Sequence, residues 1–198
     1  MIEIEKNFDL RSGQRERLIT GARLLGRKII TDSYYDLVDY SLTRRDYWLR
    51  RRDNRWELKV PYNAAAVGDR LTDRYHELET ESGIIAALQL PAGQLLEQSL
   101  TAAGYKPFVT MVTTRESYQQ GEFHLDFDEM DFGFTTFEAE IMVSDESAVV
   151  KVETKIKDFA KQYGLTSAHG RGKVIEYLYR YRSEHYQALV AAGVIVEP

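Results

Sequence analysis

Charged side chains of both signs occupy every second position in several short segments of the chain. Glu3 and Glu5 alternate with Ile2 and Ile4 at the start of the sequence. The same spacing recurs in four other charged pairs along the chain: Arg50 and Arg52, Glu57 and Lys59, Asp126 and Asp128, and Glu138 and Glu140. Because residues two apart share one face of a β-strand, each segment predicts a strand with one charged face.

The two kinds of charge suit the two parts of a metal-bound polyphosphate. Arginine binds phosphate oxygens with two parallel N–H groups, and lysine adds a compact positive charge. Clustered carboxylates are ligands that Mg²⁺ and Mn²⁺ prefer in proteins. Arg50, Arg52, Lys59 and Arg115 are the candidate cations. Their occurrence among alternating carboxylates indicates a site for a polyphosphate together with a divalent cation.

Eight segments have the residue alternation that is typical of strands. They cover residues 2–8, 29–40, 46–52, 55–60, 71–79, 108–119, 122–128 and 134–143. Asp53-Asn54 is a signal for a tight hairpin, and residues 131–133 are expected to turn the last pair of strands. Short strands joined by tight turns predict antiparallel pairing.

Apolar residues at helical spacing predict an amphipathic helix over 149–163, and further helices within 82–103, interrupted near Pro91, and within 174–192. Helices that cover the apolar strand faces from outside leave the charged faces for the inside of a curved sheet. Since buried charges cost several kcal/mol unless they are paired, a binding function is a good reason to retain them. We therefore predict an α+β fold, a closed or nearly closed eight-stranded antiparallel β-barrel with helices packed outside, in a single domain over 1–198.

Composition narrows the class of protein. The net charge of −5 argues against a nucleic-acid partner, and the absence of cysteine excludes disulfides, thiolate nucleophiles and cysteine-bound zinc. The first residues lack the pattern of a signal peptide, and no apolar run is long enough to span a membrane. We expect a cytoplasmic monomer that binds a small molecule and no membrane.

Ordered motifs over residues 2–182 resemble those of the CYTH, or triphosphate tunnel metalloenzyme, superfamily. The first is Glu3-Ile4-Glu5, which is similar to the start of a Glu-x-Glu-x-Lys signature. The others, in chain order, are Ser33-Tyr34-Tyr35-Asp36, Trp48-Leu49-Arg50-Arg51-Arg52, Trp56-Glu57-Leu58-Lys59, Tyr75-His76-Glu77-Leu78, Arg115, Asp126-Phe127-Asp128 with Asp131-Phe132-Gly133, Phe137-Glu138-Ala139-Glu140, and the segment from Gly172 to Leu178. The set is most similar to the thiamine triphosphatase branch of the superfamily.

The resemblance implies a role for each matching residue. The substrate-binding residues would be Trp48, Arg50, Arg52, Lys59, Arg115 and Lys173. The residues that hold Mg²⁺, or alternatively Mn²⁺, would be Glu3, Glu5, Asp126, Glu138 and Glu140. Lys59, Glu77 and Lys173 would take part in catalysis, and Trp48 would stack on the thiamine ring, since a cationic ring favours an indole face.

The chain departs from the family signature at Asn7, where a lysine is expected. Lys6 is adjacent but belongs to the opposite face of a regular strand. Either a β-bulge turns Lys6 inward, or the site works with one cation fewer.

The implied activity is metal-dependent hydrolysis of thiamine triphosphate to thiamine diphosphate and phosphate. An inorganic tripolyphosphatase with the same tunnel is one alternative. A non-catalytic module that binds polyphosphate or nucleotide is another, and Asn7 favours it. The His-Phe start typical of class IV adenylate cyclases is absent, which argues against that branch of the superfamily.

Overall fold

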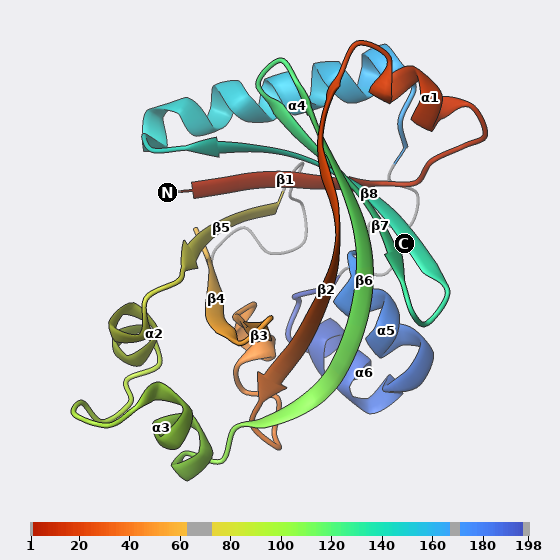
Figure 1. The fold of residues 1–198 in the computed structure, drawn as a ribbon. Coiled ribbons are helices and arrows are strands. Elements are labelled where there is room, and N and C mark those ends of the chain that lie inside the picture. Colours follow the sequence, from red (N-terminus) through yellow and green to blue (C-terminus); the bar gives the residue numbers. More distant parts are fainter. Residues whose placement is uncertain (1, 63–72, 167–170, 196–198) are drawn as a thin grey trace.

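The eight strands predicted from residue alternation form a closed antiparallel barrel. A computed structural model describes residues 2–62, 73–166 and 171–195. The order of the strands around the barrel is β1-β5-β4-β3-β2-β6-β7-β8, and β1 closes it by pairing with both β5 and β8. The strands are β1 (Ile2–Phe8), β2 (Arg23–Asp36), β3 (Trp48–Arg52), β4 (Arg55–Pro61), β5 (Asp73–Leu78), β6 (Lys106–Gln120), β7 (Phe123–Met130) and β8 (Phe134–Val143). The prediction of a closed antiparallel barrel is therefore confirmed (Figure 1).

The tight turns occur where their residues predict them. Asp53 and Asn54 both have positive φ angles, 44° and 74°, as a two-residue hairpin between β3 and β4 requires. Gly133, with φ 74°, lies in the turn between β7 and β8. These turns set the register that brings Arg50 opposite Glu57.

Strand β2 differs from the predicted segment 29–40 at both ends. It begins at Arg23, because residues 23–28 pair with β6 although a register shift near Gly26 interrupts their alternation. It ends at Asp36, whose carboxylate accepts hydrogen bonds from the backbone N–H groups of Leu42 and Thr43. Those bonds turn the chain away from the sheet, so 37–40 do not continue the strand. The other predicted strands differ by a few residues at most, with 71–72 outside the described residues.

The helices follow the predicted segments with one addition. They are α1 (Gln14–Ile19), α2 (Glu81–Ala87), α3 (Leu96–Ala102), α4 (Val149–Tyr163), α5 (Lys173–Tyr181) and α6 (Ser183–Ala191). Helix α1 was not predicted, because its six residues are too few to display a helical period. Within the described ranges, none of the helices combines the length and the apolarity that crossing a membrane requires.

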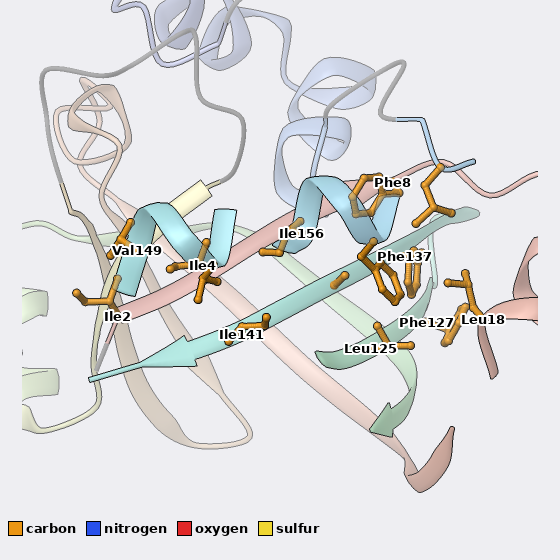
Figure 2. Close-up of a cluster of buried hydrophobic side chains, with 14 residues drawn as sticks. Ile2, Ile4, Phe8, Leu18, Leu125, Phe127, Phe137, Ile141, Val149 and Ile156 are labelled. Carbon is orange, nitrogen blue, oxygen red and sulfur yellow. The ribbon is translucent and has the colours of Figure 1, made fainter. Parts of the chain in front are cut away.

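Apolar clusters outside the barrel explain why the charged strand faces point inward. Helix α4 covers the outer face of β1 and β8, where Ile4, Phe137 and Ile156 lie in one buried cluster (Figure 2). Helices α2 and α3 cover β3 and β4, and Trp56 packs there. Where a helix covers the outer face of β1, β3, β4 or β8, period-two alternation leaves the opposite face for the interior.

Helices α5 and α6 pack differently from α4. They contact Val109 and Met111 of β6 and Met130 of β7. These three residues share a strand face with Arg115 or Asp128, which is the inner face. Helices α5 and α6 therefore pack on the inner face of β6 and β7 and close one end of the barrel. The sequence predicted helices on the outside of the barrel only.

A buried hydrogen-bond chain fastens α6 to the loop after β2. The Thr43 hydroxyl donates to Asp36 Oδ2 at 2.6 Å, and His185 Nε2 lies 2.7 Å from the same Thr43 oxygen. Because the hydroxyl proton is directed to Asp36, the ring Nε2–H is the donor to Thr43. The His185 ring also stacks on Tyr40 with 4.0 Å between centroids. This chain holds in place a helix that lines the functional cavity.

Candidate functional site

The inner strand faces surround a cavity of about 330 Å³. Most of the residues predicted to bind substrate or metal line it: Glu3, Glu5, Trp48, Arg50, Arg52, Lys59, Arg115, Glu138, Glu140 and Lys173. They come from five strands, β1, β3, β4, β6 and β8, and from the start of α5. The barrel thus gathers cations and carboxylates that are up to 170 positions apart, from Glu3 to Lys173, in one chamber.

The two arginines of β3 that line the cavity, Arg50 and Arg52, are held by carboxylates of other strands. Arg50 Nε donates to Glu57 at 2.6 Å, and its Nη2 donates to Glu77 at 3.1 Å. Arg52 donates twice to Asp32, at 2.7 and 3.0 Å. Such two-pronged pairing fixes a guanidinium plane. The structure therefore places Glu77 where it orients a basic group.

Lys173 and Arg52 share one acid. Lys173 Nζ lies 2.9 Å from Asp32 Oδ2, and Asp32 is fully buried, with 0% exposure. Burial opposes the charge on Asp32, but the hydrogen bonds from Arg52 and the charge of Lys173 outweigh it and lower the pKa of Asp32. Asp32 thereby joins a barrel strand to helix α5 at the site.

Arg115 is the centre of a second buried group. It donates twice to Asp128, at 2.6 Å each, once to Glu138 at 2.9 Å, and also to Asp126. Asp126 in addition accepts from the Ser117 hydroxyl at 2.5 Å. Four carboxylate contacts hold this guanidinium across β7 and β8.

Three glutamates form the candidate metal centre. One carboxylate oxygen from each of Glu3, Glu5 and Glu140 lies within 4.8 Å of the others. Burial and the neighbouring Glu3 and Asp126 raise the pKa of Glu140 to about 8, and burial also raises the pKa of Glu5. The cluster thus carries more carboxyl groups than the adjacent lysine neutralises. Oxygen ligands with excess negative charge fit Mg²⁺ or Mn²⁺.

Lys59 is the cation of the metal centre. Its Nζ lies 2.5 Å from Glu3 Oε2 and 3.1 Å from Glu5 Oε2. Burial opposes its charge, but the two glutamates outweigh burial and raise the pKa of Lys59. The ammonium group is therefore charged in this structure, and Lys59 lines the cavity together with Glu3 and Glu5.

Two of the five predicted metal ligands lie apart from this cluster. Asp126 is bound to Arg115, Ser117 and His124, whose Nε2 is 3.0 Å from Asp126 Oδ1. Glu138 contacts Arg115 instead. Both remain close enough to act electrostatically, since Asp126 contributes to the raised pKa of Glu140.

Asn7 occupies the position at which the family signature has lysine. The pairing of β1 with β8 is continuous from Ile2 to Phe8, so no bulge turns Lys6 inward, although Lys6 borders the cavity. Asn7 is 8% exposed and accepts a hydrogen bond from the Thr136 hydroxyl at 3.1 Å. Its amide nitrogen therefore faces away from Thr136, and a neutral donor replaces a cation at this point of the chamber.

Aromatic and apolar residues line another part of the cavity. They are Tyr34, Trp48, Tyr75, Val174, Ile175, Tyr186, Val194 and Ile195. Trp48 packs against the cluster that joins Tyr34 to α5 and α6. The chamber therefore has an ionic part and an aromatic part, which together suit a molecule with a polyphosphate and an organic ring.

Several residues of the site were missed from the sequence. Glu57 and Asp128 belong to the alternating pairs but were not assigned a role, although each holds a predicted substrate-binding arginine. Asp32 and Asp46 fall within the predicted strands 29–40 and 46–52, but neither was assigned a role. The alternation of Asp32 with Tyr34 and Asp36 was visible, but its partners on β3 and α5 were not.

Acidic groups outnumber basic groups in the ion-pair network around the chamber. Five cations, Arg50, Arg52, Lys59, Arg115 and Lys173, make ion pairs with eight carboxylates: Glu3, Glu5, Asp32, Glu57, Glu77, Asp126, Asp128 and Glu138. A polyphosphate adds further negative charge. Divalent cations are the simplest means of compensating it.

The geometry agrees with comparisons to known proteins. The CYTH domain family matches residues 1–170. The chain is 32% identical to the human thiamine-triphosphatase over 96% of this chain and 90% of that protein. The thiamine-triphosphatase of Macaca fascicularis is similar to the same extent.

Solved structures share the fold at lower identity. A protein from Pyrococcus horikoshii has a TM-score of 0.63 at 16% identity and covers 90% of this chain and 99% of its own. A Hippeastrum protein reported to have a dominant triphosphatase activity has a TM-score of 0.55 at 16% identity, covering 90% of this chain and 94% of its own. With the family match over most of the sequence and a barrel of the same architecture, the chain belongs to the CYTH domain family.

Proposed function

We propose that the protein hydrolyses thiamine triphosphate to thiamine diphosphate and inorganic phosphate with the aid of Mg²⁺, for which Mn²⁺ can substitute. The observation that carries this proposal is the chamber with an ionic part beside an aromatic part. The identity of 32% to thiamine-triphosphatases over nearly the full chain supports the same substrate.

The phosphate chain would lie among the cations of the chamber. Arg50, Arg52 and Lys173 bind the terminal phosphoryl group, and Arg115, two strands further round the barrel on β6, binds the phosphate chain. Because Asp32, Glu57 and Asp128 already fix these cations, little reorganisation is needed when the transition state develops charge. Such preorganisation provides much of the catalysis in phosphoryl transfer.

Glu3, Glu5 and Glu140 would hold the divalent cation, which neutralises phosphate oxygens and so makes the terminal phosphorus easier to attack. Water attacks that phosphorus, the bond to the bridging oxygen breaks, and thiamine diphosphate leaves with the bond's electron pair. Lys59 lies beside the same glutamates and donates to the phosphate oxygens, while Glu77 keeps Arg50 in place. The proton of the attacking water passes to the solvent or to the released phosphate.

Trp48 would bind the thiamine ring. The thiazolium ring is cationic, and an indole face attracts organic cations by about 0.5–2 kcal/mol, more when water is excluded. Trp48 borders the same cavity as Arg50 and Arg52, which lie on the same face of β3. One strand thus presents the ring-binding and phosphate-binding groups in a row.

The test is a phosphate-release assay with thiamine triphosphate, tripolyphosphate and ATP, each with Mg²⁺ and with Mn²⁺. We expect the highest kcat/KM for thiamine triphosphate and no turnover in excess chelator. A strong preference for tripolyphosphate would instead identify an inorganic tripolyphosphatase. Binding without phosphate release from any of the three would identify a non-catalytic module.

A matched pair of variants tests the site. Arg52→Glu should lower kcat/KM by about a thousandfold, since it reverses a charge at the phosphate. Arg51→Glu is the control, because Arg51 belongs to the opposite face of β3 and pairs with Glu97 outside. Near wild-type activity in Arg52→Glu would sink the assignment.

A further inference from the structure

Asp46 is a buried acid that borders the cavity without a role in binding phosphate. It lies between a short 3-10 helix (Thr43–Arg45) and β3, with a left-handed backbone at φ 62° that Asp tolerates better than most residues. It is only 2% exposed. A negative group in this position repels a polyphosphate, so its presence calls for another explanation.

Asp46 contacts two aromatic residues of the cavity. Its Oδ1 accepts a hydrogen bond from the indole Nε1 of Trp48 at 2.9 Å and another from the Tyr75 hydroxyl at 2.9 Å. Trp48 and Tyr75 come from different strands, and both line the cavity. One oxygen therefore sets the orientation of two rings.

A carboxylate at the indole N–H also changes the electrostatics of the ring. The edge of an aromatic ring is its positive part and the face its negative part. When the N–H donates to an anion, electron density shifts toward the ring, and the face attracts cations more strongly. The indole face thus gains negative potential, whereas Arg50 and Arg52, further along β3, are the cations proposed to bind the phosphates.

We propose that Asp46 is a positioning residue that selects substrates carrying a cationic organic ring, acting through Trp48 and Tyr75. This inference rests on the proposed function and deepens it by assigning the choice of organic group to a residue outside the sets proposed to bind phosphate and metal. Tyr75 extends the effect inward, since Lys59 Nζ lies 5.6 Å from the centre of its ring. A cationic ring at one end and a triphosphate at the other match this polarity.

The first experiment separates the charge of Asp46 from its shape. Asp46→Asn keeps an oxygen acceptor of the same size and removes the charge. We expect KM for thiamine triphosphate to rise about fivefold with kcat within about twofold, because cation binding to the ring is lost from ground and transition states alike. KM for tripolyphosphate, which has no ring, should stay within about twofold. Asp39→Asn, an exposed acid of the same loop, is the control and should change neither value.

A double-mutant cycle then tests whether Asp46 acts through the indole. Trp48→Phe retains a ring and removes the N–H donor. In that background Asp46→Asn should raise KM for thiamine triphosphate clearly less than it does in the wild type. Fully multiplicative effects would overturn the proposed route through Trp48, and an equal rise of KM for both substrates in Asp46→Asn would overturn the selective role.

The outcomes also distinguish this inference from the proposed function. A wild-type protein without preference for thiamine triphosphate refutes the thiamine assignment itself. A wild-type preference that persists unchanged in Asp46→Asn refutes only the role of Asp46.

Discussion

Lys59 Nζ lies 2.5 Å from Oε2 of Glu3, one of the three glutamates that form the candidate metal centre. An ammonium group and a divalent cation repel each other, so they cannot both bind the same carboxylate oxygens strongly. In the metal-free protein Lys59 therefore neutralises the oxygens that a metal ion would take. Metal binding has to displace the ammonium group of Lys59 from Glu3. The displaced ammonium group can then donate hydrogen bonds to the phosphate oxygens of a substrate.

Lys59→Met should accordingly bind metal more tightly while losing turnover. Without substrate, we expect the affinity for Mn²⁺ to rise about tenfold or more, measured by the electron paramagnetic resonance of free Mn²⁺. Lys173→Met is the control, since it removes the same charge from the same chamber but contacts Asp32. Equal gains in both variants would mean that overall charge, and not competition at Glu3, controls metal affinity.

Removing the charge of Asp32 should weaken both stability and catalysis. Asp32→Asn leaves Arg52 and Lys173 buried without their shared anion, a change that typically costs about 3–5 kcal/mol of unfolding free energy. We also expect kcat/KM to fall, because the two cations lose their fixed positions. Urea unfolding and phosphate release measure the two effects. Glu97→Gln, which breaks the exposed pair with Arg51, is the control and should cost less than about 1 kcal/mol of unfolding free energy. An equally small loss of unfolding free energy in Asp32→Asn would contradict this account.

Restoring a cation at position 7 should strengthen substrate binding. Asn7→Lys adds a positive charge on the inner face of β1, opposite Glu138 in the register. We expect KM for the triphosphate substrate to fall about tenfold, the size of one charge-assisted hydrogen bond. Steady-state phosphate release measures it. Asn7→Gln lengthens the side chain without charge, so an equal gain in that variant would attribute the effect to reach alone.

His185 should make the protein less stable in mild acid. Burial and the nearby Arg182 lower the pKa of His185 to about 4, whereas an exposed histidine titrates near 6.5. Between these values the unfolded chain binds a proton that the folded protein does not. Stability contributed by the neutral ring is therefore complete above pH 6.5 and is lost as the pH falls toward 4, by about 3 kcal/mol at most.

The measurement is the free energy of unfolding of wild type and His185→Gln from pH 7.5 to 4. The variant loses ring stacking at all pH values, but its curve should fall less steeply between pH 6.5 and 4. Parallel curves over that range would show that His185 titrates normally in the folded protein.

The barrel and most of the chamber could be predicted because both follow from alternation. Glu3 with Glu5, and Arg50 with Arg52, reveal a charged strand face by their spacing alone. Such a strand face is too highly charged to lie in a hydrophobic core, while the apolar face behind it must be covered. The charged face is therefore expected to line the inside of a closed sheet. The C-terminal end of β2 could not be predicted in this way, since Asp36 ends the strand by hydrogen bonds from its side chain to backbone N–H groups of the following loop.

The partners within the chamber could not be predicted. Asp32 is 20 residues from Arg52 and 141 from Lys173, and only the closed barrel brings the three together. Asp46 continues the alternation of Trp48 and Arg50 in the sequence, but its left-handed backbone places it before the strand, so spacing does not reveal its contacts. Helix α1 is too short to be recognised. In each case the missing information is a long-range contact or a local backbone conformation.

The position of Lys173 has a consequence for the timing of activity. The last barrel strand ends at Val143, and Lys173 follows 30 residues later at the start of α5. A ribosome therefore completes all eight strands before it adds the cation that shares Asp32 with Arg52. A growing chain whose barrel has already closed still lacks one phosphate-binding group. During translation, the nascent protein would meet cellular polyphosphates with its chamber incomplete, and the docking of the C-terminal helices would be the step that renders it competent.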